Sequence, residues 1–213
     1  MVLYRNDDYR SLSIIMFDIS LLFYLISYYV FFQDITTYAS IMRILSTIMV
    51  ITFGGILCIK KFRTIDYHVI TYFVFLMFGF LSYLWAKDGN LIISIIPTLT
   101  RTLMILLFLS IRIKGSEDIR SIMAIYIITV LIMDLFVLKL MFEFYGPKRI
   151  FLKRFGDNFG YNSNATANLN AISVMFCVFL FKYTRYKWIF PPIIVFMGAI
   201  IIMCGSKQGV VSL

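Results

Sequence analysis

The sequence predicts an all-α membrane protein, a polytopic bundle of about seven transmembrane helices. Hydrophobic residues make up 61% of its 213 positions and charged residues only 15%, whereas soluble domains contain about 45–50% and about 25%. Several apolar runs are also long enough to cross a bilayer, because a hydrocarbon core about 30 Å thick takes about 20 helical residues. Little chain remains for a soluble part, so we expect residues 1–213 to form a single transmembrane domain.

The predicted spans follow one another along the chain with short polar connections. We place them at 13–32, 40–59, 68–86, 91–113, 121–143, 165–183 and 188–204. The first run is too long for a cleavable signal peptide, and no A-x-A-like site follows it. The short basic connection 184–187 predicts a tight hairpin between the last two spans. Pro191 and Pro192 fall in the first turn of the last span, where proline is tolerated.

The distribution of positive charge predicts that the N-terminus is cytoplasmic. Eleven of the 20 Lys and Arg residues fall in segments that this orientation places inside, against six outside, as the positive-inside rule requires. Four of those six, opposed only by Asp157, lie in one external basic loop, 144–164. Outer loops are normally poor in cations. This loop therefore indicates attraction of an anion such as phosphate or a lipid diphosphate; headgroup contact or chance variation is the alternative.

Ionisable residues inside the predicted spans are costly in lipid and should face the bundle interior or water. Arg101 and Asp134 both lie about 18–20 Å from the cytoplasmic edge, at about 1.5 Å per residue, and so near the midplane. We expect that they can pair. Such a pair could equally fix helix packing without taking part in chemistry. Asp18 is a third intramembrane charge, while Arg43 and Lys139 lie near outer ends, where long side chains reach the interface.

Metal and cofactor chemistry have little basis in this composition. His68 is the only histidine, and Cys58, Cys177 and Cys204 occur in apolar runs without CxxC spacing. We therefore expect no metal site and no cofactor. Cations in membrane loops account for the net charge of +9, so we do not expect nucleic-acid binding.

One ordered set of motifs occupies residues 154–207. It begins with Arg154-x-Gly156 and continues with Gly160-x-Asn162-x-Asn164, an apolar span, the basic hairpin and a second apolar span; it ends with Gly205-Ser206-Lys207. This order resembles the O-antigen and capsular polysaccharide polymerases (Wzy-type), which belong to the O-antigen ligase superfamily. The five apolar spans upstream of these motifs also fit the architecture of this family, although no single span is specific to it.

The resemblance implies a glycosyltransferase of the bacterial inner membrane. It would polymerise oligosaccharide repeat units, carried on undecaprenyl diphosphate, at the outer face of the bilayer, with flippase and chain-length regulator proteins as further partners. Arg154 and Lys207 would be the catalytic cations that hold the diphosphate and stabilise the leaving group, since developing phosphate charge is best met by fixed donors. Asn162 and Asn164 would shape the turn or contact sugar. The remaining substrate-binding candidates are Lys153, Gly156 and Ser206.

The chain departs from the family pattern in two respects. Lys207 stands where the family usually has arginine, and lysine gives a point charge without the bidentate geometry that suits phosphate. Family members are also about twice as long and continue after the Gly-Ser-Arg turn with more spans and a large external loop. From the resemblance we expect that this chain corresponds to an N-terminal half, which would not catalyse alone.

Two other functions remain open at the level of sequence. A lipid-linked sugar flippase or related transporter would use Asp18, Arg101 and Asp134 to line a pathway, although we find neither paired repeats nor broken midplane helices. An O-antigen ligase of the same superfamily is the other alternative, and these motifs do not separate a ligase from a polymerase.

The orientation can be tested with reporter fusions. We expect fusions after Ile113 and Tyr186 to report a cytoplasmic position, and fusions after Gly89 and Asn158 to report an external one, because the cation-rich connections should stay inside. Alkaline phosphatase and fluorescent-protein fusions measure the two outcomes. A cytoplasmic Asn158 would contradict the proposed role of the basic loop, since its cations would then face the wrong compartment.

Overall fold

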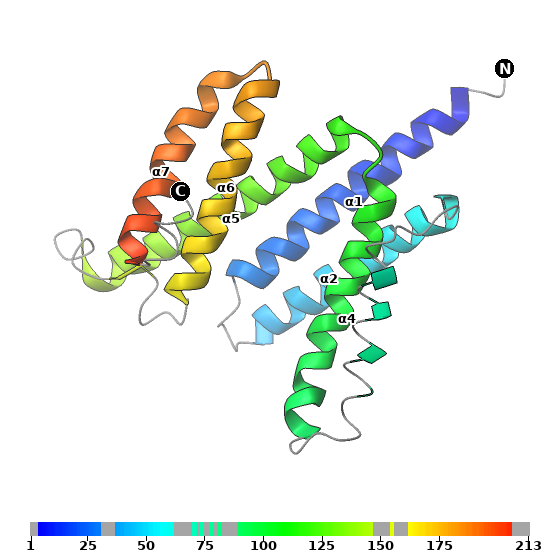
Figure 1. Ribbon diagram of the computed structural model, residues 1–213, viewed down its shortest axis with the longest axis horizontal. Helices are drawn as coiled ribbons and strands as arrows, with labels where there is room; N and C mark the ends of the chain where they lie inside the picture. The colour runs from blue at the N-terminus through cyan, green and yellow to red at the C-terminus, as the bar shows by residue number, and fades with distance from the viewer. Residues whose placement is uncertain are drawn as a thin grey trace. The chain divides into compact units, whose positions relative to one another are not determined.

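The computed structural model describes residues 4–30, 37–61, 89–146, 154–155 and 162–205, with scattered positions between 70 and 81. All regular structure in these ranges is helical, which confirms the predicted all-α class (Figure 1). The elements are α1 Tyr4–Val30, α2 Thr37–Lys61, α4 Gly89–Arg112, α5 Ser116–Tyr145, α6 Ser163–Tyr183, the 3-10 turn η2 Lys187–Ile189 and α7 Phe190–Cys204.

Among the described residues, four helical segments are long and apolar enough to cross a membrane. They are Ile41–Cys58, Ser116–Tyr145, Ser163–Tyr183 and Lys187–Cys204. Large apolar side chains on their outward faces are exposed, including Met175, Val195 and Ile202, as expected of surfaces that face lipid. The chain is therefore a multi-pass membrane protein. The predicted span 68–86 lies largely outside the described residues, so the number seven stays a prediction.

The described residues group into two compact units, Met1–Phe17 with Ile48–Asp118 and Asp18–Thr47 with Ile119–Leu213. In the first unit, the buried rings of Phe17 and Phe108 meet edge to face, with their centroids 6.2 Å apart. Phe108 also lies against Gly54 of α2, where a Cβ atom would be only 2.5 Å from the ring. The absence of a side chain at Gly54 is what lets the aromatic ring sit there.

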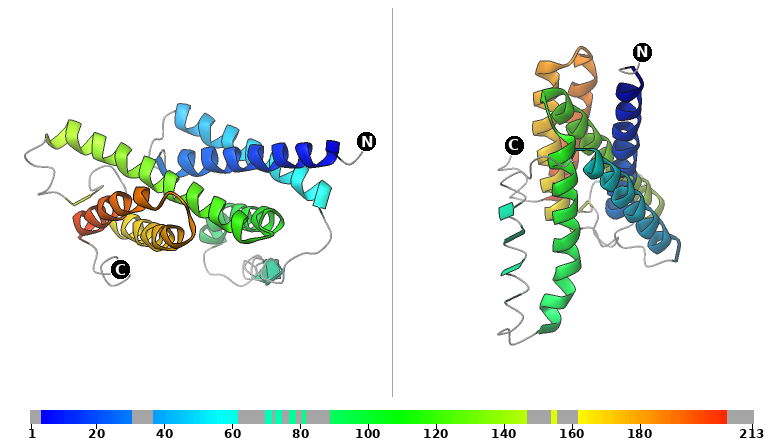
Figure 2. Two further views of the ribbon diagram at one scale, coloured as in Figure 1. Left: turned by 90° about the horizontal axis from the view of Figure 1, so that it is seen from above. Right: turned by 90° about the vertical axis from the view of Figure 1, so that its right-hand side faces the viewer.

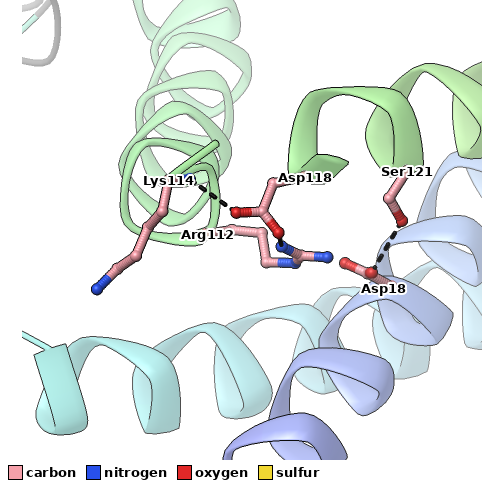
Figure 3. Close-up of polar contacts among 5 residues, drawn as sticks. All are labelled: Asp18, Arg112, Lys114, Asp118 and Ser121. Carbon is pink, nitrogen blue, oxygen red and sulfur yellow. Dashed lines mark hydrogen bonds and ion pairs between the residues drawn. The ribbon is translucent and has the colours of Figure 1, made fainter. Parts of the chain in front are cut away.

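Asp118 fixes the turn between α4 and α5 (Figure 3). Its carboxylate forms an ion pair with Arg112 and accepts a hydrogen bond of 2.9 Å from the backbone N–H of Lys114. Arg112 ends α4 and Asp118 lies in the first turn of α5. Each charge therefore also interacts favourably with the dipole of its helix. The sequence indicated Arg112 only as an inner-loop cation; the structure buries its side chain, with 4% exposed.

In the second unit, α6 and α7 form an antiparallel hairpin that packs against α5 (Figures 1 and 2). Their shared core is apolar, and the small side chains of Ala171 and Cys177 allow close approach, as small residues do between membrane helices. The buried members of this cluster are Ile127, Val130, Met133, Ala171, Val174, Cys177, Leu180, Met197 and Ile201. The predicted hairpin is confirmed, with α6 ending at Tyr183 and α7 beginning at Phe190.

Both ends of α7 follow the expected helix-terminus chemistry. Pro191 and Pro192 occupy its first turn, where the missing N–H groups would have no intrahelical partner. At the other end, Gly205 takes a left-handed conformation with φ of 59°, and its N–H donates to the carbonyl of Ile202. A glycine therefore suits this position, because other residues are strained there.

Polar side chains within the second unit bond to neighbouring helices. The hydroxyls of Ser27 on α1 and Ser46 on α2 lie 2.6 Å apart and both residues are buried. Ser121 on α5 donates a hydrogen bond of 3.3 Å to Asp18 on α1 (Figure 3). Asp18, predicted to be an intramembrane charge, thus has a polar partner on another helix, which reduces the cost of placing it in a span.

The contact between Gly54 and Phe108 predicts opposite effects at two adjacent glycines. Gly54→Ala should destabilise the protein by about 1–3 kcal/mol, because its methyl group overpacks the Phe108 ring. Gly55→Ala should be neutral or stabilising, since open space surrounds that position and alanine is the better helix former. Thermal unfolding in one detergent, followed by circular dichroism, compares the two. Equal melting temperatures would show that Phe108 does not occupy the space beside Gly54.

Candidate functional site

The connection between α5 and α6 returns to the C-terminal end of α7, and Phe155 anchors it there. The side chain of Phe155 is fully buried, and its backbone N–H donates a hydrogen bond of 3.0 Å to the carbonyl of Met203. Around the ring lie buried residues from α5, α6 and α7: Val137, Met141, Ala167, Ile200 and Cys204. Burial of one large aromatic side chain stabilises by about 1.5–3 kcal/mol, enough to hold this point of the loop against the helix ends.

Arg154 precedes that anchor and is exposed, with its guanidinium held at two helix ends. Its Nε donates a hydrogen bond of 2.6 Å to the carbonyl of Cys204, in the last turn of α7. Its Nη2 donates a longer one of 3.4 Å to Oδ1 of Asn164, in the first turn of α6. The partly negative C-terminus of α7 favours a cation at this position. The first turn of α6, the last turn of α7 and the connection between α5 and α6 therefore meet at Arg154.

The guanidinium of Arg154 has further N–H donors that neither Cys204 nor Asn164 uses. Arginine carries five N–H bonds in a planar fork, and two of those on Arg154 are used by Cys204 and Asn164. Among the described residues, none accepts a hydrogen bond from Nη1. The edge formed by Nη1 and the second N–H of Nη2 matches the bidentate geometry in which arginine binds phosphate or carboxylate.

Asn162 caps the start of α6. Its side-chain oxygen accepts hydrogen bonds from the backbone N–H groups of Asn164 at 3.0 Å and Ala165 at 3.3 Å. Its own carbonyl accepts from the N–H of Thr166 at 2.9 Å. The N–H groups of Asn164 and Ala165 are therefore used by the cap and are not available to bind an anion at this helix terminus. Asn162 shapes the turn, and Asn164 positions Arg154.

The structure brings together three of the predicted site residues, Arg154, Asn162 and Asn164. The candidates Lys153, Gly156, Ser206 and Lys207 lie outside the described residues. Arg154 itself lies against the end of α7, where it contacts the carbonyl of Cys204. The role of Lys207 in anion binding stays a prediction.

Arg101 and Asp134, the predicted intramembrane pair, belong to different compact units. Asp134 is fully buried on α5, and its side-chain partner is Asn170 of α6, which donates a hydrogen bond of 3.2 Å. Arg101 belongs to the other compact unit, so its pairing with Asp134 stays a prediction. Lys139 is 70% exposed and lies 3.7 Å from Glu143, one turn further along α5. An exposed pair of this kind contributes little to stability.

Sequence reasoning missed two residues that organise this region. Phe155 was not singled out, although an aromatic residue directly after a cation in a polar loop is a recognisable signal of an anchor. Asn170 was not considered as the partner of Asp134, although a polar residue in an apolar span is itself a signal. Within the described ranges, no three His, Cys, Asp or Glu side chains are close enough to hold a metal ion.

No protein-family model, curated protein or solved structure matches this chain. The resemblance to polysaccharide polymerases therefore has no support beyond the motifs and their order in the sequence.

The cap at Asn162 can be tested by local hydrogen exchange. Asn162→Ala should weaken the first turn of α6 by about 1 kcal/mol, which corresponds to about fivefold faster exchange at the amides of Asn164 and Ala165. Asn162→Asp should keep the protection, since aspartate caps equally well and its charge suits a helix N-terminus. Asn168→Ala, at an exposed position of the same helix, is the control and should leave these amides unchanged. Equal exchange in Asn162→Ala and wild type would contradict the cap.

Proposed function

We propose that this chain binds an undecaprenyl-diphosphate-linked oligosaccharide through Arg154 and takes part in polymerising such units into surface polysaccharide. In this proposal the protein crosses the bacterial inner membrane about seven times with its N-terminus in the cytoplasm. The observation that carries the proposal is the position of Arg154: an exposed guanidinium, held at the junction of the α6–α7 hairpin and the basic loop, that retains unused donors.

The geometry favours an anion over a neutral ligand. A fixed arginine fork gives charge-assisted, bidentate hydrogen bonds to phosphate oxygens. Because Cys204 and Asn164 already orient the guanidinium, less side-chain entropy is lost when the anion binds. In a polymerisation, the same cation would stabilise the diphosphate as it leaves the anomeric carbon, where negative charge develops.

The contact of Nε with the Cys204 carbonyl also gives Arg154 a structural role at the end of α7. A purely structural arginine would need only this contact, whereas the proposal depends on the opposite edge of the guanidinium. The two roles therefore predict different behaviour for anion binding and for stability, which can be measured separately.

Two alternatives share parts of this evidence. An O-antigen ligase would bind the same lipid diphosphate donor. A lipid-linked sugar transporter is favoured by one observation, the fully buried Asp134 on α5, since ionisable groups inside membrane bundles often line transport pathways.

Binding of undecaprenyl diphosphate to the full chain in lipid nanodiscs tests the proposed site. Arg154→Gln should weaken binding about tenfold to a hundredfold, since it removes charged hydrogen bonds of about 1.5–3 kcal/mol. Arg154→Lys should recover part of the affinity, because lysine keeps the charge and loses the fork. Native mass spectrometry of the lipid-bound protein, with phosphatidylglycerol as competitor, measures both and separates a diphosphate site from general attraction to anionic headgroups.

Lys139→Gln is the matched control, because it removes an exposed cation that contacts neither helix end of the site. If Arg154→Gln weakens binding no more than Lys139→Gln, Arg154 is an ordinary interfacial cation. Catalysis is tested by polymer length in a strain whose surface polysaccharide depends on this protein. There, Arg154→Ala should abolish polymerisation at unchanged protein level, and full activity would refute the catalytic role.

A further inference from the structure

Asp134 of α5 and Asn170 of α6 form a polar pair in the interior of the second unit. Neither residue is exposed, and Nδ2 of Asn170 lies 3.2 Å from Oδ1 of Asp134. Both helices are candidate membrane spans. Among the buried residues described in this unit, Asp134 is the only one whose side chain is normally charged in water at neutral pH. An ionised carboxylate without a counter-cation is expensive in such an environment.

Two hydrogen-bond acceptors of this pair have no donor among the described residues. The two N–H bonds of Asn170 are both used, one by Asp134 and the other by the carbonyl of Thr166 at 3.1 Å. Two oxygens remain, Oδ2 of Asp134 and Oδ1 of Asn170. Both are buried, and among the described residues neither has a hydrogen-bond partner. Both oxygens are acceptors, so this hydrogen-bonded pair has two buried acceptors without a donor among the described residues, and neither N–H of Asn170 is left over.

We propose that Asp134 and Asn170 together bind one proton at neutral pH, carried on Oδ2 of Asp134 and donated to Oδ1 of Asn170. A carboxylic acid and a primary amide are complementary in this way, with N–H···O in one direction and O–H···O in the other. The single proton turns Oδ2 from an acceptor into a donor and gives Oδ1 its partner. It also removes the buried charge, which is the larger part of the cost.

A proton fits this site better than a metal cation. Calcium takes six to eight oxygen ligands and magnesium requires an octahedral shell, whereas the pair offers two unused oxygens. The groups packed around it are mainly apolar. The ionisable side chains in or against the neighbouring core clusters are Cys177 on α6, Cys204 on α7, and Tyr126 and Tyr145 on α5. Lys139 and Glu143 on α5 are exposed and paired with each other. On α1, Asp18 bonds to Ser121.

With the proton bound between Asp134 and Asn170, the contact between α5 and α6 would depend on the protonation state of Asp134. Asn170 lies six residues, or about 9 Å along the helix, from Asn164, which contacts Arg154. Loss of the proton would leave a buried negative charge against an oxygen acceptor and push the two helices apart. This inference does not depend on the proposed ligand of Arg154.

Infrared spectroscopy of the full chain in lipid nanodiscs at neutral pH tests the proposal, because a carboxylic acid has a C=O band that a carboxylate lacks. We expect wild type to show such a band, and labelling aspartate with heavy carbon at the carboxyl group should move it. Asp134→Asn should abolish the band, and Asn170→Leu should shift it to higher frequency by removing the hydrogen bonds. Glu143→Gln, which removes an exposed carboxylate from the same helix, should leave it unchanged.

Absence of the band in folded wild type, or its survival in Asp134→Asn, would overturn the proposal and indicate an ionised carboxylate solvated by water. A band that disappears when sodium chloride replaces choline chloride would also overturn it, in favour of a cation site. If Asp134→Asn does not fold, the Asn170→Leu spectrum of isotope-labelled protein decides: an unshifted aspartate band would show that the acid does not bond to the amide.

Discussion

Close packing of α6 against α7 is the constraint on which the rest of the second unit depends. Ala171 and Cys177 present little bulk on the buried face of α6, so the two helices can run side by side from the basic turn to their opposite ends. At the end away from the basic turn, the last backbone carbonyls of α7 then lie near the first turn of α6. Phe155 and Arg154 bind there because both helix ends lie at one place.

Within lipid, polar side chains must find partners inside the protein, and most buried ones described here do so locally. Thr129 and Ser173 donate to backbone carbonyls one turn earlier on their own helices, and Ser27 bonds to Ser46 across two helices. The pair of Asp134 and Asn170 differs, because it retains two acceptors for which the described part of the chain supplies no donor. Such a residual demand is costly in a purely structural contact, and for this reason the pair invites a functional explanation.

The proposed lipid diphosphate site depends on one feature of the sequence and one feature of the tertiary structure. The charge comes from sequence, through the concentration of cations in the loop 144–164. The orientation comes from structure, through the two hydrogen bonds that direct one edge of Arg154 toward the protein. At the N-terminus of α6, Asn162 accepts hydrogen bonds from the N–H groups of Asn164 and Ala165. The cap therefore supports the position of Asn164, and the proposed anion binding rests on the side chain of Arg154.

The sequence alone determined the membrane class, the helical hairpin and the ends of α7, because these depend on local quantities: apolar length, the backbone of Pro191 and Pro192, and the conformational freedom of Gly205. Only the tertiary structure decided that Phe155 anchors the loop, that the carbonyl of Cys204 holds Arg154, and that Asn170 is the partner of Asp134. Depth along a span can be counted from sequence, so it could place Asp134 near the midplane. The partner depends on which helix lies beside it and how that helix is rotated, and both follow from side-chain packing between segments distant in the chain.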